Sequence, residues 1–408
     1  MATITAPPHA TTNAADAPRR LELVAEHRRG QLGPVTVVQI VVIELAATAI
    51  AIVVAATRAR NVAVLAAVLF LANLMVFAVF LRSGGAWWYR QRLLRRRLRQ
   101  RRRAGRTAAR ATGSPLAALA PGLSVRTVFD RGSRIGVGQD SAGWYAVLEA
   151  MVPETLRGDR SGALVLDRLT RIFTETAVPV SALQVVSHTV PAPAGMLDAR
   201  APCWQAYTEL VEGGPVAAYQ VLWVAVRLNP ADAAAAAASR GGGLAGVDRA
   251  LAAAVGRIGK ALTAADVAYR VLDAEDLLSA LTTSCAPEEG DGAAAPEAYE
   301  HWTAWQAGNS AYTCLGLSRW PQQSPEALFA ALSAVPARAV SVAVILQPSG
   351  ERIAVRALVR VVTQREALRE AVAELTAVAR RAGARLQRVD GEHGLGVYAT
   401  APTAGGLL

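Results

Sequence analysis

Two apolar stretches near the N-terminus decide the architecture: PVTVVQIVVIELAATAIAIVVAAT at residues 34–57 and NVAVLAAVLFLANLMVFAVFL at residues 61–81. As a helix rising about 1.5 Å per residue, either stretch can cross a hydrocarbon core about 30 Å thick. Only residues 58–60 separate them, which leaves room for nothing but a tight turn. The sequence therefore predicts an antiparallel transmembrane helix hairpin over residues 34–81.

Arginine is distributed unevenly around the two predicted spans. Twelve arginines and no acidic residue lie between Arg82 and Arg110, four arginines precede the first span, and two lie in the turn. Positively charged residues near the ends of spans tend to stay on the cytoplasmic side. We therefore expect a multi-pass cell (inner) membrane protein with two spans, whose N-terminus and soluble domain are cytoplasmic.

The high net charge is local. The formal net charge is +11, and residues 82–110 contribute +12. In a soluble protein such a tract is often a nucleic-acid arm, but beside a membrane span it is first a topology signal and a contact for anionic lipid. Aromatic residues at its start match an interfacial belt, so we expect membrane lipid and no nucleic acid as partner. The predicted interface residues are Trp87, Trp88, Tyr89, Arg90, Arg92, Arg95, Arg96 and Arg97.

Two polar side chains are expected near the middle of the membrane. Glu44 lies about ten residues into the first span, and Asn73 lies about eight residues from the cytoplasmic end of the second. A carboxylate at that depth is costly and usually has a partner. We expect an intramembrane polar contact, within the hairpin or with another protein's helix, in preference to a proton relay.

The rest of the chain divides by composition. Residues 1–33 are rich in Ala, Thr and Pro and are expected to be flexible. Residues 82–122 combine the arginine-rich juxtamembrane segment with a Gly/Ala/Pro linker. An acidic, Gly-rich stretch at residues 286–296 predicts a second linker. It separates a first α/β unit, residues 123–285, from a second, residues 297–408.

The order of predicted elements recurs in these two units. From residue 144, and again from residue 310, the periodicity gives strand, helix, strand, strand, helix, strand. This is the order of a split βαβ unit, so the sequence predicts an α/β (α+β) body of two ferredoxin-like units. The expected strands are 125–130, 134–138, 144–152, 180–190, 216–228, 267–272, 310–319, 339–347, 352–362, 385–389 and 396–400, and the expected helices are 163–176, 244–264, 274–283, 325–335 and 365–381.

Sequence motifs for a cofactor or a metal are weak. No GxxxxGK[ST] loop is present, and the GVG at residues 136–138 is a partial GxGxxG in an expected hairpin. The GGG at residues 241–243 could present amides to a phosphate, although a plain helix start is favoured. His188 is expected to be a packed strand histidine. His393 lies in DGEHG at residues 390–394, a turn that looks exposed and could hold an acid/base pair. We predict no catalytic, cofactor-binding or metal-binding residue.

Several strings together resemble a known family. They are LQVVSHTVPAPAG at 183–195, VLWVAVRLNP at 221–230, SRGGGLAGVDRAL at 239–251, YEHWTAWQAGNSAYTCLGLSRWP at 299–321 and LGVYATAP at 395–402. Following two spans and a basic tract, they resemble EccE, the membrane component of actinobacterial type VII secretion systems, in its longer, Arg-rich, Streptomyces-like form.

The resemblance implies a subunit of a membrane complex that exports small helical proteins. In that complex the subunit lies beside a ubiquitin-like membrane component, a single-span periplasmic component and an ATPase, and no catalytic residue is carried over. The sequence leaves two classes of function. The favoured one is a non-enzymatic structural component of type VII protein transport, which docks its cytoplasmic α/β domain onto neighbouring subunits. The alternative is a membrane-anchored enzyme acting on a nucleotide or sugar.

Overall fold

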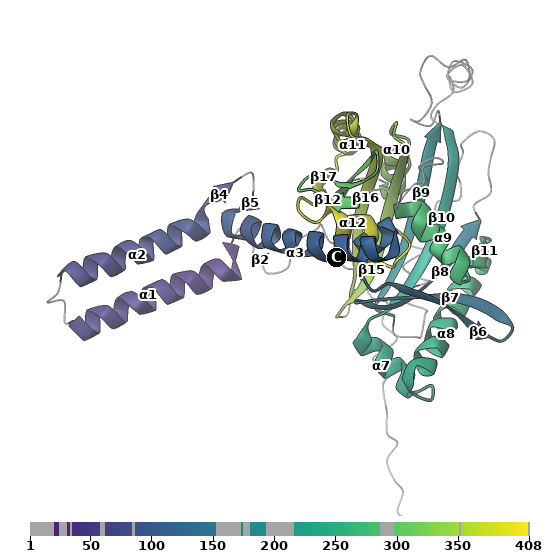
Figure 1. Ribbon diagram of the computed structural model, residues 1–408, viewed down its shortest axis with the longest axis horizontal. Helices are drawn as coiled ribbons and strands as arrows, with labels where there is room; N and C mark the ends of the chain where they lie inside the picture. The colour runs from purple at the N-terminus through teal and green to yellow at the C-terminus, as the bar shows by residue number, and fades with distance from the viewer. Residues whose placement is uncertain are drawn as a thin grey trace, which may run out of the picture.

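The computed structural model shows an N-terminal helix hairpin, a long helix α3 and a body built on one large sheet (Figure 1). It describes residues 20–23, 31–32, 35–57, 62–83, 86–151, 173, 180–192, 216–285, 298–322, 324–350 and 352–406.

The hairpin consists of α1 (Val37–Thr57) and α2 (Val62–Phe80), which lie side by side. Large apolar side chains such as Leu45 and Phe70 are exposed on it. The window Gln39–Ala56 of α1 is long and apolar enough to cross a membrane, whereas the apolar part of α2, Val62–Ala78, is shorter. The two helices expected from the sequence are therefore present, and their surface is apolar.

The segment after the hairpin is largely helical, including most of the part expected to be a Gly/Ala/Pro linker. Short strands β4 (Arg82–Ser83) and β5 (Ala86–Trp87) pair and lead into α3 (Trp88–Thr112). Arg, Ala, Leu and Gln, which fill α3, are all strong helix formers. The helix ends at Gly113, which has a positive φ, and α4 (Pro115–Leu119) begins at once.

The N-terminal segment also departs from expectation. Residues 1–33 were expected to be flexible, yet β1 (Arg20–Leu23) pairs in parallel with β16 (Arg352–Gln364). Strands β2 (Gln31–Leu32) and β3 (Val35–Thr36) form a small ladder just before α1. Local composition gave no sign of β1 because its partner strand lies far away in the sequence.

Among the described residues, the first half of the body contributes six strands to the sheet. Strands β6, β7 and β8 form a meander, and the other pairings give the order β11-β8-β10-β9. The strand β7 pairs with the beginning of β8, and β11 pairs with its end. The bounds are β6 Ser124–Asp130, β7 Ser133–Asp140, β8 Gly143–Met151, β9 Ala182–Ala192, β10 Val216–Leu228 and β11 Ala268–Val271.

The second half repeats this arrangement. Strands β12, β13 and β14 form a meander, the other pairings give the order β17-β14-β16-β15, and β13 and β17 share one edge of β14. Strands β8 and β14 thus hold equivalent places. The bounds are β12 Ala298–Glu300, β13 Trp305–Ala307, β14 Ser310–Arg319, β15 Ala339–Ser349 and β17 Arg385–Arg388.

The two halves share a continuous sheet because β9 pairs antiparallel with β15, from Leu183 opposite Leu346 to Thr189 opposite Val340. Apart from β1, the strand pairings described within this sheet are antiparallel. The structure is thus mixed α/β with a mostly antiparallel sheet. The expected linker at 286–296 and the helix at 163–176, Phe173 aside, lie outside the described residues.

Helices cover both faces of the sheet. One face packs against α7, α8, α10 and α11, and the other against α4, α9 and α12. The strand expected at 396–400 is wrong, because those residues belong to α12 and the turn after it, and α7 was not expected at all. The bounds are α7 Pro230–Ala238, α8 Gly243–Ala264, α9 Ala274–Cys285, α10 Pro325–Ser333, α11 Leu368–Arg381 and α12 His393–Ala399.

The GVG at residues 136–138 lies inside β7, in the hairpin expected from the sequence, and does not form a nucleotide loop. Its glycines serve close packing. A Cβ on Gly138 would lie 2.3 Å from Cζ of Tyr145, and one on Gly136 would lie 2.3 Å from the carbonyl oxygen of Asp273.

Two glycine-to-alanine variants should therefore have opposite effects on stability. Gly138→Ala overpacks Tyr145 and should lower the free energy of unfolding by about 1–3 kcal/mol. Gly256→Ala, in the interior of α8 with open space around the position, should raise it by up to about 1 kcal/mol, because alanine is the better helix former. Urea unfolding of the purified protein followed by circular dichroism measures both, and equal effects would contradict the packing argument.

Candidate functional site

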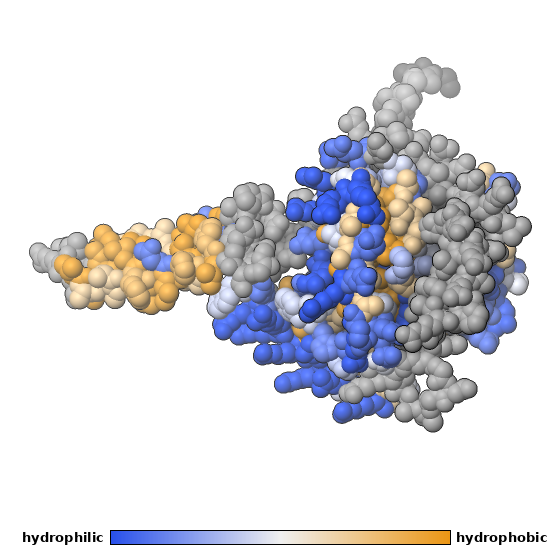
Figure 2. All heavy atoms as spheres, turned by 90° about the horizontal axis from the view of Figure 1, so that it is seen from above, coloured by the Kyte–Doolittle hydropathy of each residue, from blue (hydrophilic) through white to orange (hydrophobic). Residues whose placement is uncertain are grey.

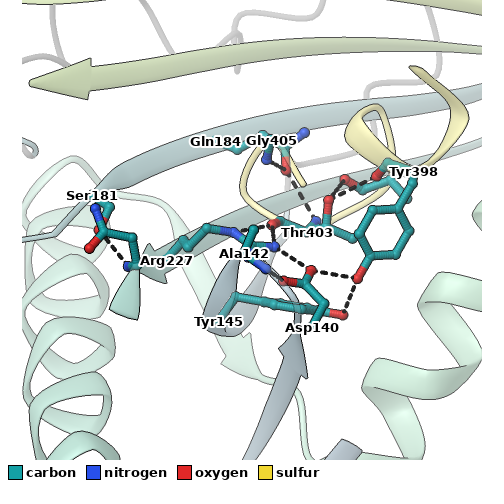
Figure 3. Close-up of polar contacts among 11 residues, drawn as sticks. Asp140, Ala142, Tyr145, Ser181, Gln184, Arg227, Tyr398, Thr403 and Gly405 are labelled. Carbon is teal, nitrogen blue, oxygen red and sulfur yellow. Dashed lines mark hydrogen bonds and ion pairs between the residues drawn. The ribbon is translucent and has the colours of Figure 1, made fainter. Parts of the chain in front are cut away.

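The C-terminal segment of the second half is held by the first half of the body (Figure 3). The side-chain amide of Gln184, on β9, donates to the carbonyl of Ala399 at 2.6 Å. Its oxygen accepts from the backbone N–H groups of Thr403 and Gly405, each at 3.2 Å. A single buried side chain thus fixes α12 and the turn that follows it onto β9.

A buried ion pair lies beside this contact. The two terminal nitrogens of Arg227, on β10, donate to the two carboxylate oxygens of Asp140 at 2.6 and 2.7 Å. The Arg227 guanidinium also donates to the carbonyl of Thr403, and the hydroxyl of Tyr398 donates to Asp140 at 2.8 Å. We call this group of Asp140, Arg227, Tyr398 and Thr403 the junction (Figure 3). Only 5% of the Arg227 side chain and 2% of the Asp140 side chain are exposed, so the ion pair is closed to solvent.

The protonation states of the junction suit a structural contact. Burial favours the neutral acid, but the hydrogen bonds and charge of Arg227 outweigh burial and hold the pKa of Asp140 below its ordinary 3.8. Burial raises the pKa of Tyr145 and of Tyr398, so both phenols stay neutral. Because each oxygen of Asp140 already has two partners, counting the N–H of Ala142, the carboxylate has little capacity left to bind a metal ion or to act as a base.

A second buried arginine joins three elements of the body. Arg360, on β16, is fully buried and donates to the hydroxyls of Ser284 and Ser341, both at 2.7 Å, and to the carbonyl of Val397 at 3.0 Å. Ser341 in turn lies 2.8 Å from Nδ1 of His188. Since Arg360 donates to Ser341, the serine hydroxyl is left to donate to the imidazole. The group connects α9, β15, β9 and α12.

The serine and histidine in this group do not form a catalytic pair. Burial, together with the charge of Arg360, lowers the pKa of His188 to about 3, so the imidazole stays neutral. Both side chains are buried, and His188 stacks on Trp223, so a substrate has no access. His188 is the packed strand histidine that the sequence predicted.

The turn around His393 differs from its expected form. His393 is fully buried and begins α12, so the expectation of an exposed turn is wrong. Its Nδ1 accepts the N–H of Cys314 at 3.2 Å, and its Nε2 lies 3.6 Å from Asp390, beyond a good hydrogen bond. Burial raises the pKa of Cys314 to about 12, so this neighbour remains a thiol.

The GGG at residues 241–243 begins α8 beside an apolar cleft of about 430 Å³. The cleft is lined by alanines of α7 together with Trp144, Leu244 and Val247. The guanidinium of Arg249 lies beside Gly241 but donates to the carbonyl of Arg240, and the residues that line the cleft carry no cation or hydroxyl. The plain helix start favoured from the sequence fits this environment.

Helix α3 docks on the body through one face. The guanidinium of Arg101 donates to both carboxylate oxygens of Glu300, at 3.2 and 3.3 Å, and to the carbonyl of Gly391, while Arg102 donates to the carbonyl of Glu300. The N–H of Gly394 also donates to Glu300, at 2.8 Å. Glu300 thus ties α3 to the start of α12, beside a cavity of about 140 Å³.

Close packing completes this contact. A Cβ on Gly105 would lie 2.6 Å from the carbonyl oxygen of Ala118, so α3 and α4 can meet only at a glycine. Leu94 and Leu98 are buried on the same face, about three and two turns before Gly105. Arg95 places its guanidinium 5.4 Å from the ring centre of Trp302 in the body.

The residues predicted at the membrane interface lie at the start of α3 and just before it. Trp87 ends β5 and Trp88 begins α3, and Arg92 stacks 4.4 Å from the ring centre of Trp88. Arg95 contacts the body, whereas Arg96 and Arg97 are exposed. Tyr89 and Arg90 lie in the first turn of α3.

The two polar residues of the hairpin are exposed on its surface. The Asn73 amide donates to the carbonyl of Leu69 at 3.0 Å, and the carbonyl of Glu44 accepts from Thr48 at 2.8 Å. Among the described contacts, none joins Glu44 to Asn73. The structure thus leaves the Glu44 carboxylate on an outer surface of the hairpin.

Sequence reasoning missed the residues that hold these contacts together. Asp140, Arg227, Glu300 and Arg360 were not singled out. A signal was present for the two arginines, because Arg227 interrupts the apolar run VLWVAVRL and Arg360 interrupts ALVRVV. A charged residue inside an apolar strand indicates a buried partner.

Comparison with known proteins came from a family model. The family described as "Putative type VII ESX secretion system translocon, EccE" matches residues 216–317, which run from β10 almost to the end of β14. The match includes Arg227 and Glu300 and confirms the resemblance to EccE read from the sequence. No curated protein matches the chain. A translocon component is the function that the family implies.

Breaking the buried ion pair should destabilise the body strongly. Asp140→Asn leaves the Arg227 charge buried without a counter-ion and should lower the free energy of unfolding by about 3–5 kcal/mol. Glu374→Gln removes the exposed pair with Arg381 and should cost less than about 1 kcal/mol. Urea unfolding at pH 7 measures the difference, and equal losses would contradict a structural junction.

The same unfolding measurement, repeated at a series of pH values, tests the direction of the Asp140 pKa shift. Because the folded pKa of Asp140 is depressed, its contribution is present above the unfolded pKa of about 3.9 and is lost as pH falls through the folded pKa. The gap between wild type and Asp140→Asn should therefore be constant near neutral pH and close below about pH 4.

Proposed function

We propose that the chain is a non-enzymatic structural component of the type VII (ESX-like) secretion membrane complex. The observation that carries the proposal is the EccE family match over residues 216–317. The contacts described above support it, because the buried polar groups of the junction serve packing and leave little capacity for chemistry. Protein transport is then a property of the assembled complex.

In this proposal α1 and α2 are the two membrane spans. An apolar surface and the 18-residue window Gln39–Ala56 support the assignment, and Figure 2 shows an apolar hairpin surface interrupted by a small polar patch. The arginine asymmetry of the sequence supports a cytoplasmic N-terminus and body. Trp88, Tyr89 and Arg92, in the first turns of α3, then lie where lipid head groups begin.

The cytoplasmic body is proposed to be two ferredoxin-like units, residues 123–285 and 297–408. In chain order, β8 to β11 and β14 to β17 each have the strand order 4-1-3-2, and each series begins with the last strand of a three-stranded meander. The outer strand β6 exposes Phe129, 76% accessible, on a surface suited to docking. The partners proposed from the resemblance are the ubiquitin-like membrane component, the ATPase and the single-span periplasmic component.

The alternative, a membrane-anchored enzyme acting on a nucleotide or sugar, has less support. Within the described residues, no group of three His, Cys, Asp or Glu side chains could hold a metal ion. Burial raises the pKa of Cys285 to about 11, which disfavours its thiolate. His301 is partly exposed and bonds to Gln306 at 3.1 Å, so it is the accessible candidate for an active-site variant.

The topology can be tested with cysteines at two positions. A cysteine at Ala104, exposed on α3, should resist an impermeant thiol reagent in intact cells and react after lysis. A cysteine at Ala59, in the turn between the spans, should react in intact cells. Labelling at 104 in intact cells would overturn the cytoplasmic placement.

Replacing Glu44 should separate insertion from assembly. Glu44→Leu makes the span more apolar, so membrane insertion should be unchanged or improved, but a polar contact with a partner helix would be lost. Purification of Glu44→Leu in mild detergent should then recover less of the other subunits, and export should fall. The control Ile43→Leu, at an exposed neighbouring position, should leave both recovery and export unchanged. Full export with Glu44→Leu would contradict a polar contact between Glu44 and a partner helix.

A separate variant tests the alternative function. Loss of export in a His301→Ala protein that is folded and assembled would favour the membrane-anchored enzyme.

A further inference from the structure

Helix α3 carries an unusually regular row of arginines. Their spacing alternates between four and three residues, so they share one face of a helix with 3.6 residues per turn. All six are exposed, and the row spans about 27 Å at 1.5 Å per residue. This arginine stripe consists of Arg92, Arg96, Arg99, Arg103, Arg106 and Arg110.

The stripe points away from the body because the opposite face of α3 is occupied. Leu94 and Leu98 are buried there, Arg101 bonds to Glu300, and Gly105 packs on Ala118. Rotation of α3 would break all of these contacts. Figure 2 shows strongly polar side chains standing out between the hairpin and the body, along the stretch where Figure 1 places α3.

The charge of the stripe is not balanced within α3. The helix contains no acidic residue, and neighbours on the stripe are three or four residues apart, where like charges destabilise a helix. Among the described contacts, the guanidinium groups of Arg99, Arg103 and Arg110 have no ion pair. A negatively charged partner would remove this repulsion.

Lipid accounts for the beginning of the stripe only. Helix α3 continues away from the hairpin towards the body (Figure 1), so Arg110 lies about 27 Å further along than Arg92. Electrostatic interactions are screened over about 8 Å at physiological salt. If the hairpin spans the membrane, as the proposed function states, the distal arginines are beyond the reach of the head groups.

We propose that the distal stripe, from Arg99 to Arg110, binds an acidic helix of a neighbouring subunit in the membrane complex. Two helices packed side by side match each other's repeat, so the partner carries Asp or Glu at alternating spacings of three and four residues. Each arginine can donate two hydrogen bonds to one carboxylate of the partner. A straight row one residue wide fits a helix better than the two curved phosphate strands of a nucleic-acid duplex.

A defined peptide tests the recognition. The full-length protein in nanodiscs of neutral lipid is titrated with a helical peptide bearing Glu at 4-3 spacing and with a scrambled peptide of equal composition. The variant R103E/R110E should bind the spaced peptide roughly tenfold more weakly than wild type. R369E/R380E, with the same charge change at exposed sites of α11, should stay within about twofold. Equal binding of the two peptides, or equal loss in the two variants, would overturn the proposal.

A second arm identifies the occupant in cells. A photo-cross-linking residue at position 103 should form an adduct with an acidic segment of a co-purifying subunit, and the same residue at 369 should not. Adducts at 103 with lipid or nucleic acid alone would overturn the proposal. The neutral variant R103Q/R110Q, checked for helicity by circular dichroism, should also reduce recovery of the complex. Full recovery of the complex with both R103E/R110E and R103Q/R110Q would refute the proposed role of the arginine stripe but leave the proposed function standing. If the wild-type protein never co-purifies with other subunits, the proposed function itself is refuted.

Discussion

The pairing of β9 with β15 is the constraint on which the rest of the body depends. Seven residue pairs, from Leu183 with Leu346 to Thr189 with Val340, convert two sheets into one. Both strands become central and are covered on both faces, which explains why most of their residues are buried. The few polar side chains in these strands, among them Gln184 and Ser341, must then find partners inside the protein. Those partners come from the C-terminal segment and from β16.

The buried polar groups therefore lie where the two halves meet. Arg227 and Asp140 belong to the first half, and the carbonyl of Thr403 and the hydroxyl of Tyr398 complete their contacts from the second. Arg360 makes the reciprocal connection, from the second half to Ser284 at the end of the first. The charges of Asp140 and Arg227 compensate each other within the first half, but the hydrogen bonds from Tyr398 and to the carbonyl of Thr403 form only when both halves are in place. This arrangement favours a body that folds as one unit.

Helix α3 connects the hairpin to the body. Its inner face is fixed by two contacts. Glu300 accepts hydrogen bonds from Arg101 and from the backbone N–H of Gly394 in α12, and Gly105 packs closely on Ala118 of α4. Its outer face carries the arginine stripe. Within the same tract of arginines, the structure separates a residue in a structural ion pair, Arg101, from the exposed arginines of the stripe, which composition alone cannot do.

The sequence alone determined the elements whose signal is local. Helical apolar runs of membrane length predicted α1 and α2, period-two and apolar patterns predicted most strands of the sheet, and the recurring order pointed to two similar halves. Elements without a local signal were wrong or missed. Strand β1 depends on a partner more than 300 residues away, and residues 396–400, expected as a strand, form the end of α12, where Gly396 packs closely on Cys314. Only the tertiary structure decided which arginines are buried, because a guanidinium is stable inside a protein only when distant segments bring acceptors to it. The same holds for the face of α3 that remains exposed, which follows from contacts of Glu300 that no local pattern encodes.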